Sequence, residues 1–192
     1  MTEFTNALPL PRARTLVHPG PVGPIRIEHR HANQARHFRL GLEPGRSMED
    51  AIIEPLLLLG VQSASMTLLG GRLDRLLYCV APPDPTGERV ANYTRPIDAG
   101  AATLIFGNAT LGKNARGEAI VHCHATFVCA DGSVRGGHIV VDRSTVAEST
   151  IPVLVTTLDG IELRITHDEE THMPLMRPFA AAVEMEETSH AI

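Results

Sequence analysis

Three histidines near the middle of the chain have the residue type and the spacing of a metal site. His122 and His124 form an H-x-H pair, and His138 follows them after a turn that contains Gly132. Residues two apart on a β-strand share a face, so a strand here points His122 and His124 the same way. A three-residue hairpin loop with Gly132 in the left-handed conformation sets His138 opposite His124. Three imidazoles then meet on one sheet face, which is the outline of a metal site.

The alternative is that these histidines are structural or surface residues. The chain has 10 histidines among 192 residues, and a second H-x-H pair occurs at His29 and His31. We interpret that second pair, which lies among charged residues, as solvated surface. The twin glycines Gly136 and Gly137 favour a site on the other segment, because glycine weakens a strand unless a backbone, a loop or a ligand comes close.

Three neutral imidazoles suit Zn²⁺, Ni²⁺, Co²⁺ or Fe²⁺, and ligand type does not choose among these ions. Three protein ligands also leave a fourth position for water or a small-molecule ligand. Catalysis would need an acid or base beside the metal, and the carboxylates of the right class are Glu118, Asp131, Glu148 and Glu162. The sequence contains no nucleophile elbow, phosphate-binding loop or dinucleotide fingerprint. A metal-dependent hydrolase or lyase therefore stays open beside a ligand-binding role.

Composition predicts a single domain with an aliphatic core. The chain is 43% hydrophobic but only 4% aromatic, and it has no Trp. No apolar run reaches the roughly 18 residues of a membrane span. The three cysteines are scattered without a C-x-x-C pair, which favours a reducing compartment and predicts the cytoplasm.

Charge is distributed unevenly along the chain, whose net charge is −5. Residues 1–46 carry seven Arg against three Glu, whereas residues 142–192 carry ten acidic residues against three Arg. The acidic balance disfavours a non-specific nucleic-acid binder, which normally has a basic footprint. The basic N-terminal segment could contact phosphate, but we expect it to lie along an acidic C-terminal surface of its own chain or a neighbour's.

The pattern of apolar residues, turns and caps predicts an N-terminal extended arm over residues 1–33, a domain over 34–180 and an acidic tail over 181–192. It favours an α+β fold with a twisted, mostly antiparallel sheet of about seven strands and one or two helices. Ser47 is expected to cap the main helix, with Asp50 in a capping position. The expected elements are a strand at 36–42, the helix at 48–59, hairpins at 61–80, 119–141 and 152–166, and a strand at 101–110.

Several segments taken together resemble the plants and prokaryotes conserved (PPC) domain family. The resemblance covers about residues 36–177, and its most specific part is the order H-x-H, D-G and G-G-H at these distances. The matching segments are HFRLGLEPG at 37–45 with the helix after it, GNATLG at 107–112, HCHATF at 122–127, ADGSVRGGHI at 130–139, the segment around Glu148, and ELRITHDEET at 162–171.

The resemblance implies a homotrimer of α+β domains with a metal, zinc, at His122, His124 and His138. Glu148, in a matching segment, could accept a hydrogen bond from a ligand imidazole, although a surface or interface carboxylate is the commoner role. In plants the domain follows an AT-hook with an R-G-R-P core, and this chain has only Pro11-Arg12-Ala13-Arg14. The expected function is a metal-binding ligand-sensing or partner-binding module, with a DNA-binding regulator as an alternative beside the enzyme.

Overall fold

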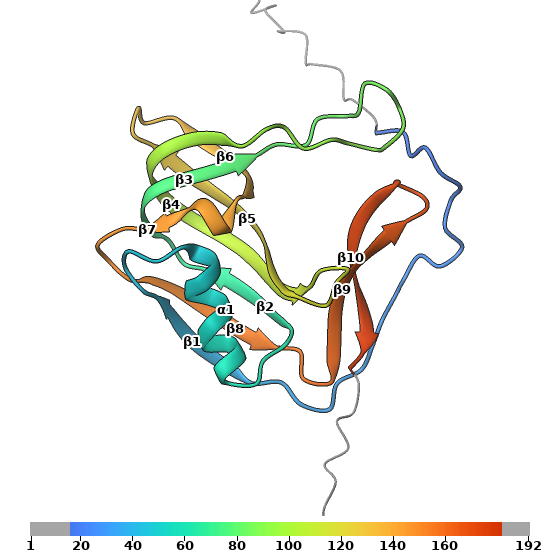
Figure 1. The fold of residues 1–192 in the computed structure, drawn as a ribbon, viewed down its shortest axis with the longest axis horizontal. Helices are drawn as coiled ribbons and strands as arrows, with labels where there is room; N and C mark the ends of the chain where they lie inside the picture. The colour runs from blue at the N-terminus through green and yellow to red at the C-terminus, as the bar shows by residue number, and fades with distance from the viewer. Residues whose placement is uncertain (1–15, 182–192) are drawn as a thin grey trace, which may run out of the picture.

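A computed structural model describes residues 16–181, in which ten strands pair into one sheet and one α-helix covers part of it (Figure 1). The predicted α+β fold with a mostly antiparallel sheet is confirmed, with ten strands instead of about seven. The elements are β1 (His37–Leu42), α1 (Met48–Leu58), β2 (Ala64–Leu68), β3 (Gly71–Cys79), β4 (Ile97–Lys113), β5 (Ala119–Cys129), β6 (Val134–Ile139), the 3₁₀ turn η1 (Val141–Arg143), β7 (Thr145–Val146), β8 (Ile151–Thr157), β9 (Ile161–Asp168) and β10 (Met173–Ala180).

Two strands went unrecognised in the sequence for different reasons. β7 is only two residues long and lies within a polar connection. β10 contains Pro174 and Pro178, and proline cannot donate to a sheet ladder, so this pattern argues against a strand. β10 tolerates both prolines because β9 is its only partner among the described strands.

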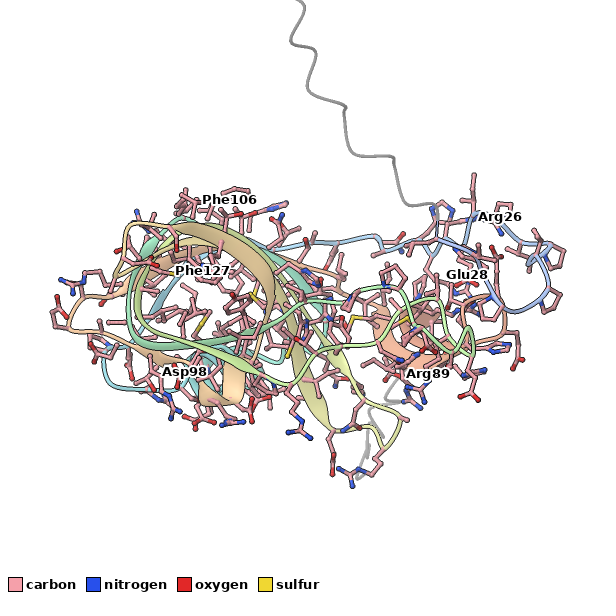
Figure 2. The ribbon with its side chains drawn as sticks, turned by 90° about the horizontal axis from the view of Figure 1, so that it is seen from above. Arg26, Glu28, Arg89, Asp98, Phe106 and Phe127 are labelled. Atoms are coloured by element: carbon pink, nitrogen blue, oxygen red, sulfur yellow. The ribbon has the colours of Figure 1, made fainter. Side chains whose placement is uncertain are left out.

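The long strand β4 organises the sheet. One edge of β4 pairs first with β3 and then with β2, while its other edge pairs with β5 along most of its length. β6 pairs with β5 and also reaches the end of β3, so the pairings among β3, β4, β5 and β6 close into a ring. The ring encloses Phe127, which is fully buried and meets Tyr78 edge-on with 5.0 Å between ring centroids (Figure 2).

The helix α1 begins as its sequence predicts. The Asp50 backbone N–H donates to the Ser47 hydroxyl at 3.0 Å, a cap worth about 1 kcal/mol. Pro55 lies inside the helix, and Gly60, at φ +70°, follows its C-terminal cap. Within residues 16–181 no helix is long and apolar enough to cross a membrane.

The predicted hairpin about Gly70 and Gly71 is wrong. β2 and β3 do not pair with each other, since they run one after the other along the same edge of β4. The two glycines form a kink in this path, with positive φ at both residues. A Cβ at Gly70 would lie 2.9 Å from the Ile105 carbonyl oxygen, so the close approach of β4 requires glycine here.

The predicted hairpin between β8 and β9 is also wrong. The turn at Asp159 and Gly160 exists, with Gly160 at φ +80°. However, β8 already has β1 on one edge and β2 on the other, so no edge remains for β9. β9 instead pairs antiparallel with β10 and touches the end of β4.

The described part of the arm, from residue 16, forms no helix or strand and runs beside the β9–β10 hairpin (Figure 1). Glu170, in the turn of that hairpin, contacts the arm. Its carboxylate accepts from the Gly23 N–H at 2.8 Å and lies 2.7 Å from a His18 ring nitrogen and 2.5 Å from the Arg26 guanidinium. The expectation that the arm lies along an acidic C-terminal surface agrees with these contacts within one chain. Residues 1–15 and most of the predicted tail, 182–192, lie outside the described residues.

Candidate metal centre

Strand alternation on β5 turns its histidines away from the core. Cys123 and Phe127 are fully buried, and residues of the other parity therefore point to the outer face. His122 is half-buried and His124 is exposed on that face. Cys123 is a small core residue, and burial raises the pKa of its thiol to about 12.

The predicted register of the histidine hairpin is confirmed. His124 lies directly opposite His138, and the Cys129 N–H donates to the Ser133 carbonyl at 2.9 Å. Gly132 supplies the left-handed residue of the turn, at φ +81°. A turn type readable from the sequence therefore sets which residues face each other across β5 and β6.

The three imidazoles meet closely. One ring nitrogen from each of His122, His124 and His138 can be chosen so that all three lie within 4.8 Å of one another. The ring centroids are 4.9, 4.8 and 5.4 Å apart. In zinc sites each nitrogen lies about 2.0–2.1 Å from the ion, so ligand nitrogens are roughly 3–3.5 Å apart. Small rotations of the side chains would close the remaining difference.

Electrostatics keep two of these rings neutral. Burial lowers the pKa of His122, and the nearby His124 lowers it further. Burial, and then His122 and His124, lower the pKa of His138 to about 4. Neutral imidazole is the form that binds a metal. The Nδ1 atom of His138 is also buried without a hydrogen-bond partner, which costs free energy unless something bonds to it. The residues present therefore fit a divalent metal.

The glycines beside His138 have a structural explanation. A Cβ at Gly137 would lie 2.5 Å from the Cys79 carbonyl oxygen and 3.1 Å from the Tyr78 ring. A Cβ at Gly136 would lie 3.1 Å from the Ala125 carbonyl oxygen. The close approach that the sequence indicated is thus made by the backbone of the neighbouring strands, chiefly β3, and it lets β6 close the ring.

Glu148 lies far from the three histidines in the structure. Its carboxylate is exposed and faces the Arg72 guanidinium at 3.6 Å. Arg72 is seven residues along β3 from Cys79, the partner of His138, which corresponds to about 20 Å. Within one chain, Glu148 is therefore too distant to accept a hydrogen bond from a ligand imidazole.

The other candidate carboxylates are also engaged away from the histidines. Asp131 accepts from Ser133 in the hairpin turn. Glu118 pairs with Arg116, and Glu162 pairs with Lys113 at 2.6 Å and with Arg164. None of these carboxylates belongs to the group of metal-ligating atoms found among residues 16–181.

Sequence reasoning missed one neighbour of the site. Tyr93, from the loop between β3 and β4, lies over His138 with 5.0 Å between ring centroids. The sequence gives little indication of this contact, because the loop is Pro-rich and Tyr93 lies 45 residues from His138 along the chain. An isolated bridge between Pro83 and Ala91, and a hydrogen bond from the Thr94 N–H to the Val80 carbonyl at 2.9 Å, hold the loop in place.

Comparison with known proteins rests on structure. No family model and no curated protein matches the chain in sequence. A PPC protein from Pyrococcus horikoshii is similar over 78% of this chain and 94% of its own, with 19% identity and a TM-score of 0.56. The chain has the PPC fold.

Two further proteins of known structure share the PPC fold with this chain. A metal-containing protein from Archaeoglobus fulgidus matches 79% of this chain and 99% of its own, with 18% identity and a TM-score of 0.60. A proposed DNA-binding protein from Ralstonia eutropha JMP134 matches 72% of this chain and 88% of its own, with 16% identity and a TM-score of 0.57. At these identities the likeness concerns the fold alone, so the chemistry of the PPC-like chain must be argued from its own residues.

Proposed function

We propose that this chain binds a divalent metal, zinc, through His122, His124 and His138, and acts as a ligand-sensing or partner-binding module of the PPC family. The observation that carries the proposal is the meeting of three ring nitrogens within 4.8 Å on one sheet face. When bound, a metal held by three imidazoles supplies a Lewis-acid centre with a position open to a ligand. The metal content of the Archaeoglobus fulgidus protein adds support from the same fold.

The test is elemental analysis of tag-free protein, for the wild type and for the His122→Ala and His124→Ala variants. About one ion per chain in the wild type, lost in both variants, is the expected result. His31→Ala is the matched control, because His29 and His31 form an H-x-H pair with 5.3 Å between ring centroids and belong to no three-residue ligand group in the described part. Equal metal content in all four proteins would refute the site.

The proposed assembly is a homotrimer, and the proposed compartment is the cytoplasm. Support for assembly comes from exposed large apolar side chains. Phe106, on the outside of the sheet in Figure 2, is 51% exposed, and Val134 on β6 is 63% exposed. We propose that neighbouring subunits cover these side chains in the trimer, since contiguous apolar surface marks an interface. Light scattering coupled to size-exclusion chromatography measures the mass directly, and a monomeric mass near 20.7 kDa would contradict the trimer.

Two other functions compete with this proposal. A metal-dependent hydrolase or lyase is favoured by the open ligand position, but each of the acidic residues predicted for acid–base work has a partner elsewhere. DNA binding is favoured by the description of the Ralstonia eutropha protein and disfavoured by the net charge of −5. Salt-dependent affinity for duplex DNA, measured by fluorescence anisotropy, would support the DNA-binding alternative.

A further inference from the structure

A cavity of about 360 Å³ adjoins His138 and is also lined by Ile120 and Val121, which precede His122 on β5. Its walls come from segments far apart in sequence. The β5 and β6 strands supply apolar residues, α1 supplies Glu49, η1 supplies Asp142, and the loop before β4 supplies Tyr93. This volume is within the range of sites for small organic ligands, and such sites combine apolar walls with a few polar groups.

The polar groups at this cavity are mostly acidic. Glu49 and Asp142 both line it, and neither forms an ion pair with a described residue. Burial raises the pKa of Glu49, and the nearby Asp142 raises it further. Two carboxylates that repel each other and have no cationic partner favour a cation in the cavity that both of them line.

Tyr93 adds an aromatic wall to the same cavity, beside His138. Its ring is tilted by 45° against that of His138, and the residue is 47% exposed. Aromatic rings attract organic cations through their π faces. The apolar side chains of Val121, Ile139 and Val140 line the same cavity and suit a short hydrocarbon chain.

We propose that this cavity is the ligand site beside the metal centre, and that it takes a small zwitterion: a carboxylate directed to the metal and an ammonium group directed to Glu49 and Asp142. The inference rests on the proposed metal binding. Three neutral imidazoles leave the charge of a divalent ion uncompensated, so an anionic oxygen is the preferred fourth ligand. The acidic end of the cavity then selects for a cationic group at the other end of the same molecule.

The test uses Co²⁺-substituted protein, in which the visible absorption of the ion reports a ligand at the metal. Cobalt content per chain is measured first. The probes are ω-amino carboxylates (glycine, β-alanine, 4-aminobutanoate and 6-aminohexanoate), each compared with the alkanoate of equal carbon number. We expect one length of amino carboxylate to change the spectrum at a concentration about tenfold lower than its alkanoate does.

The variants locate the source of that preference. Glu49→Gln combined with Asp142→Asn should abolish the roughly tenfold preference for the amino carboxylate and leave both the cobalt content and the alkanoate response unchanged. Glu54→Gln is the matched control on α1, since Glu54 pairs with Arg46 and does not line the cavity. Tyr93→Ala should weaken binding of the amino carboxylate more than binding of the alkanoate. Tyr93→Phe should retain most of the preference for the amino carboxylate.

The outcomes separate the two proposals. If wild-type protein takes up no cobalt, both the metal centre and this ligand site are refuted. If it takes up cobalt but amino carboxylates and alkanoates act at equal concentrations, or if neither changes the spectrum, the metal centre stands and the ligand site is overturned. A preference that survives the double substitution would also overturn it, because another group would then be the cation site.

Discussion

At the scale of single residues, the histidine cluster depends on groups whose removal leaves the core intact. His122, His124 and His138 lie on the outer face, whereas Cys123 and Phe127 fill the interior. The candidate metal ligands and the packing residues therefore lie on opposite faces of the sheet formed by β5 and β6. This separation allows the site to be removed without removing the fold.

The substitution His138→Ala should abolish metal binding while the protein stays folded. The strand that carries His138, β6, is held by its pairing with β5 and β3. The His138 imidazole makes no hydrogen bond through its buried Nδ1. Elemental analysis and circular dichroism measure the two properties on the same sample. Unfolding of the variant would show instead that the metal site is structural.

At the scale of elements, the approach of β6 to β3 depends on a residue without a side chain. Gly137 lies against the Cys79 carbonyl oxygen at the end of β3, and the preceding residue Tyr78 pairs with Ile97 of β4, which limits how far this backbone can yield. Gly136 faces a looser contact on β5. A methyl group added at Gly137 would therefore clash more severely than one added at Gly136.

Gly137→Ala should lower the free energy of unfolding by about 1–3 kcal/mol, as overpacking does in other cores. Gly136→Ala should lower it by less than about 1 kcal/mol. Urea titration of both variants against the wild type measures the difference. Equal destabilisation would mean that the loss of glycine, rather than the contact with β3, sets the cost.

At the scale of the whole molecule, Glu170 links the N-terminal arm to the C-terminal hairpin. The arm side chains Arg26 and Glu28 lie on this side of the molecule (Figure 2). Arg177 on β10 adds a second link, 3.3 Å from Glu28. Hydrogen bonds from the Gly23 N–H, His18 and Arg26 lower the pKa of Glu170 to about 2.

The pH dependence of this link follows from that depressed pKa. The unfolded value is about 4.3, so the carboxylate stabilises the docked arm above that pH. The contribution should be lost as pH falls from about 4 towards 2, when the carboxylate is protonated. Amide hydrogen exchange at residues 18–26 between pH 5 and pH 2.5, corrected for the intrinsic exchange rate, measures docking. Protection that is constant over this range would contradict the role of Glu170.

Glu170→Gln should release the arm at neutral pH and increase protease cleavage within residues 18–30, with the core unchanged. Its matched control is Glu169→Gln, because Glu169 is exposed and its only described ion-pair partner is His167 at 3.6 Å. Limited proteolysis followed by mass spectrometry locates the cuts. Identical cleavage of the two variants would refute the link.

Deletion of residues 1–33 should leave the domain folded, because all the strands and the helix described within residues 16–181 lie beyond residue 33. Circular dichroism tests the fold, and light scattering tests the mass. A folded but smaller assembly would identify the arm as part of an interface between subunits.

The sequence by itself determined the local features of this protein. Strand alternation, the Gly132 turn and the Ser47 cap act through neighbouring residues, so the histidine hairpin, its register and the helix start could all be predicted. The meeting of the three histidines followed from that register.

Only the tertiary structure decided how strands distant in the chain pair. The Gly70–Gly71 and Asp159–Gly160 segments have turn sequences, yet neither joins a hairpin. A strand can pair only with a strand edge that is free. The residues of a turn do not determine which edges other strands already occupy. The same holds for the group of Tyr93, Glu49 and Asp142 around His138. These residues come together through loop and helix packing over long separations in sequence, and no short-range pattern encodes that approach.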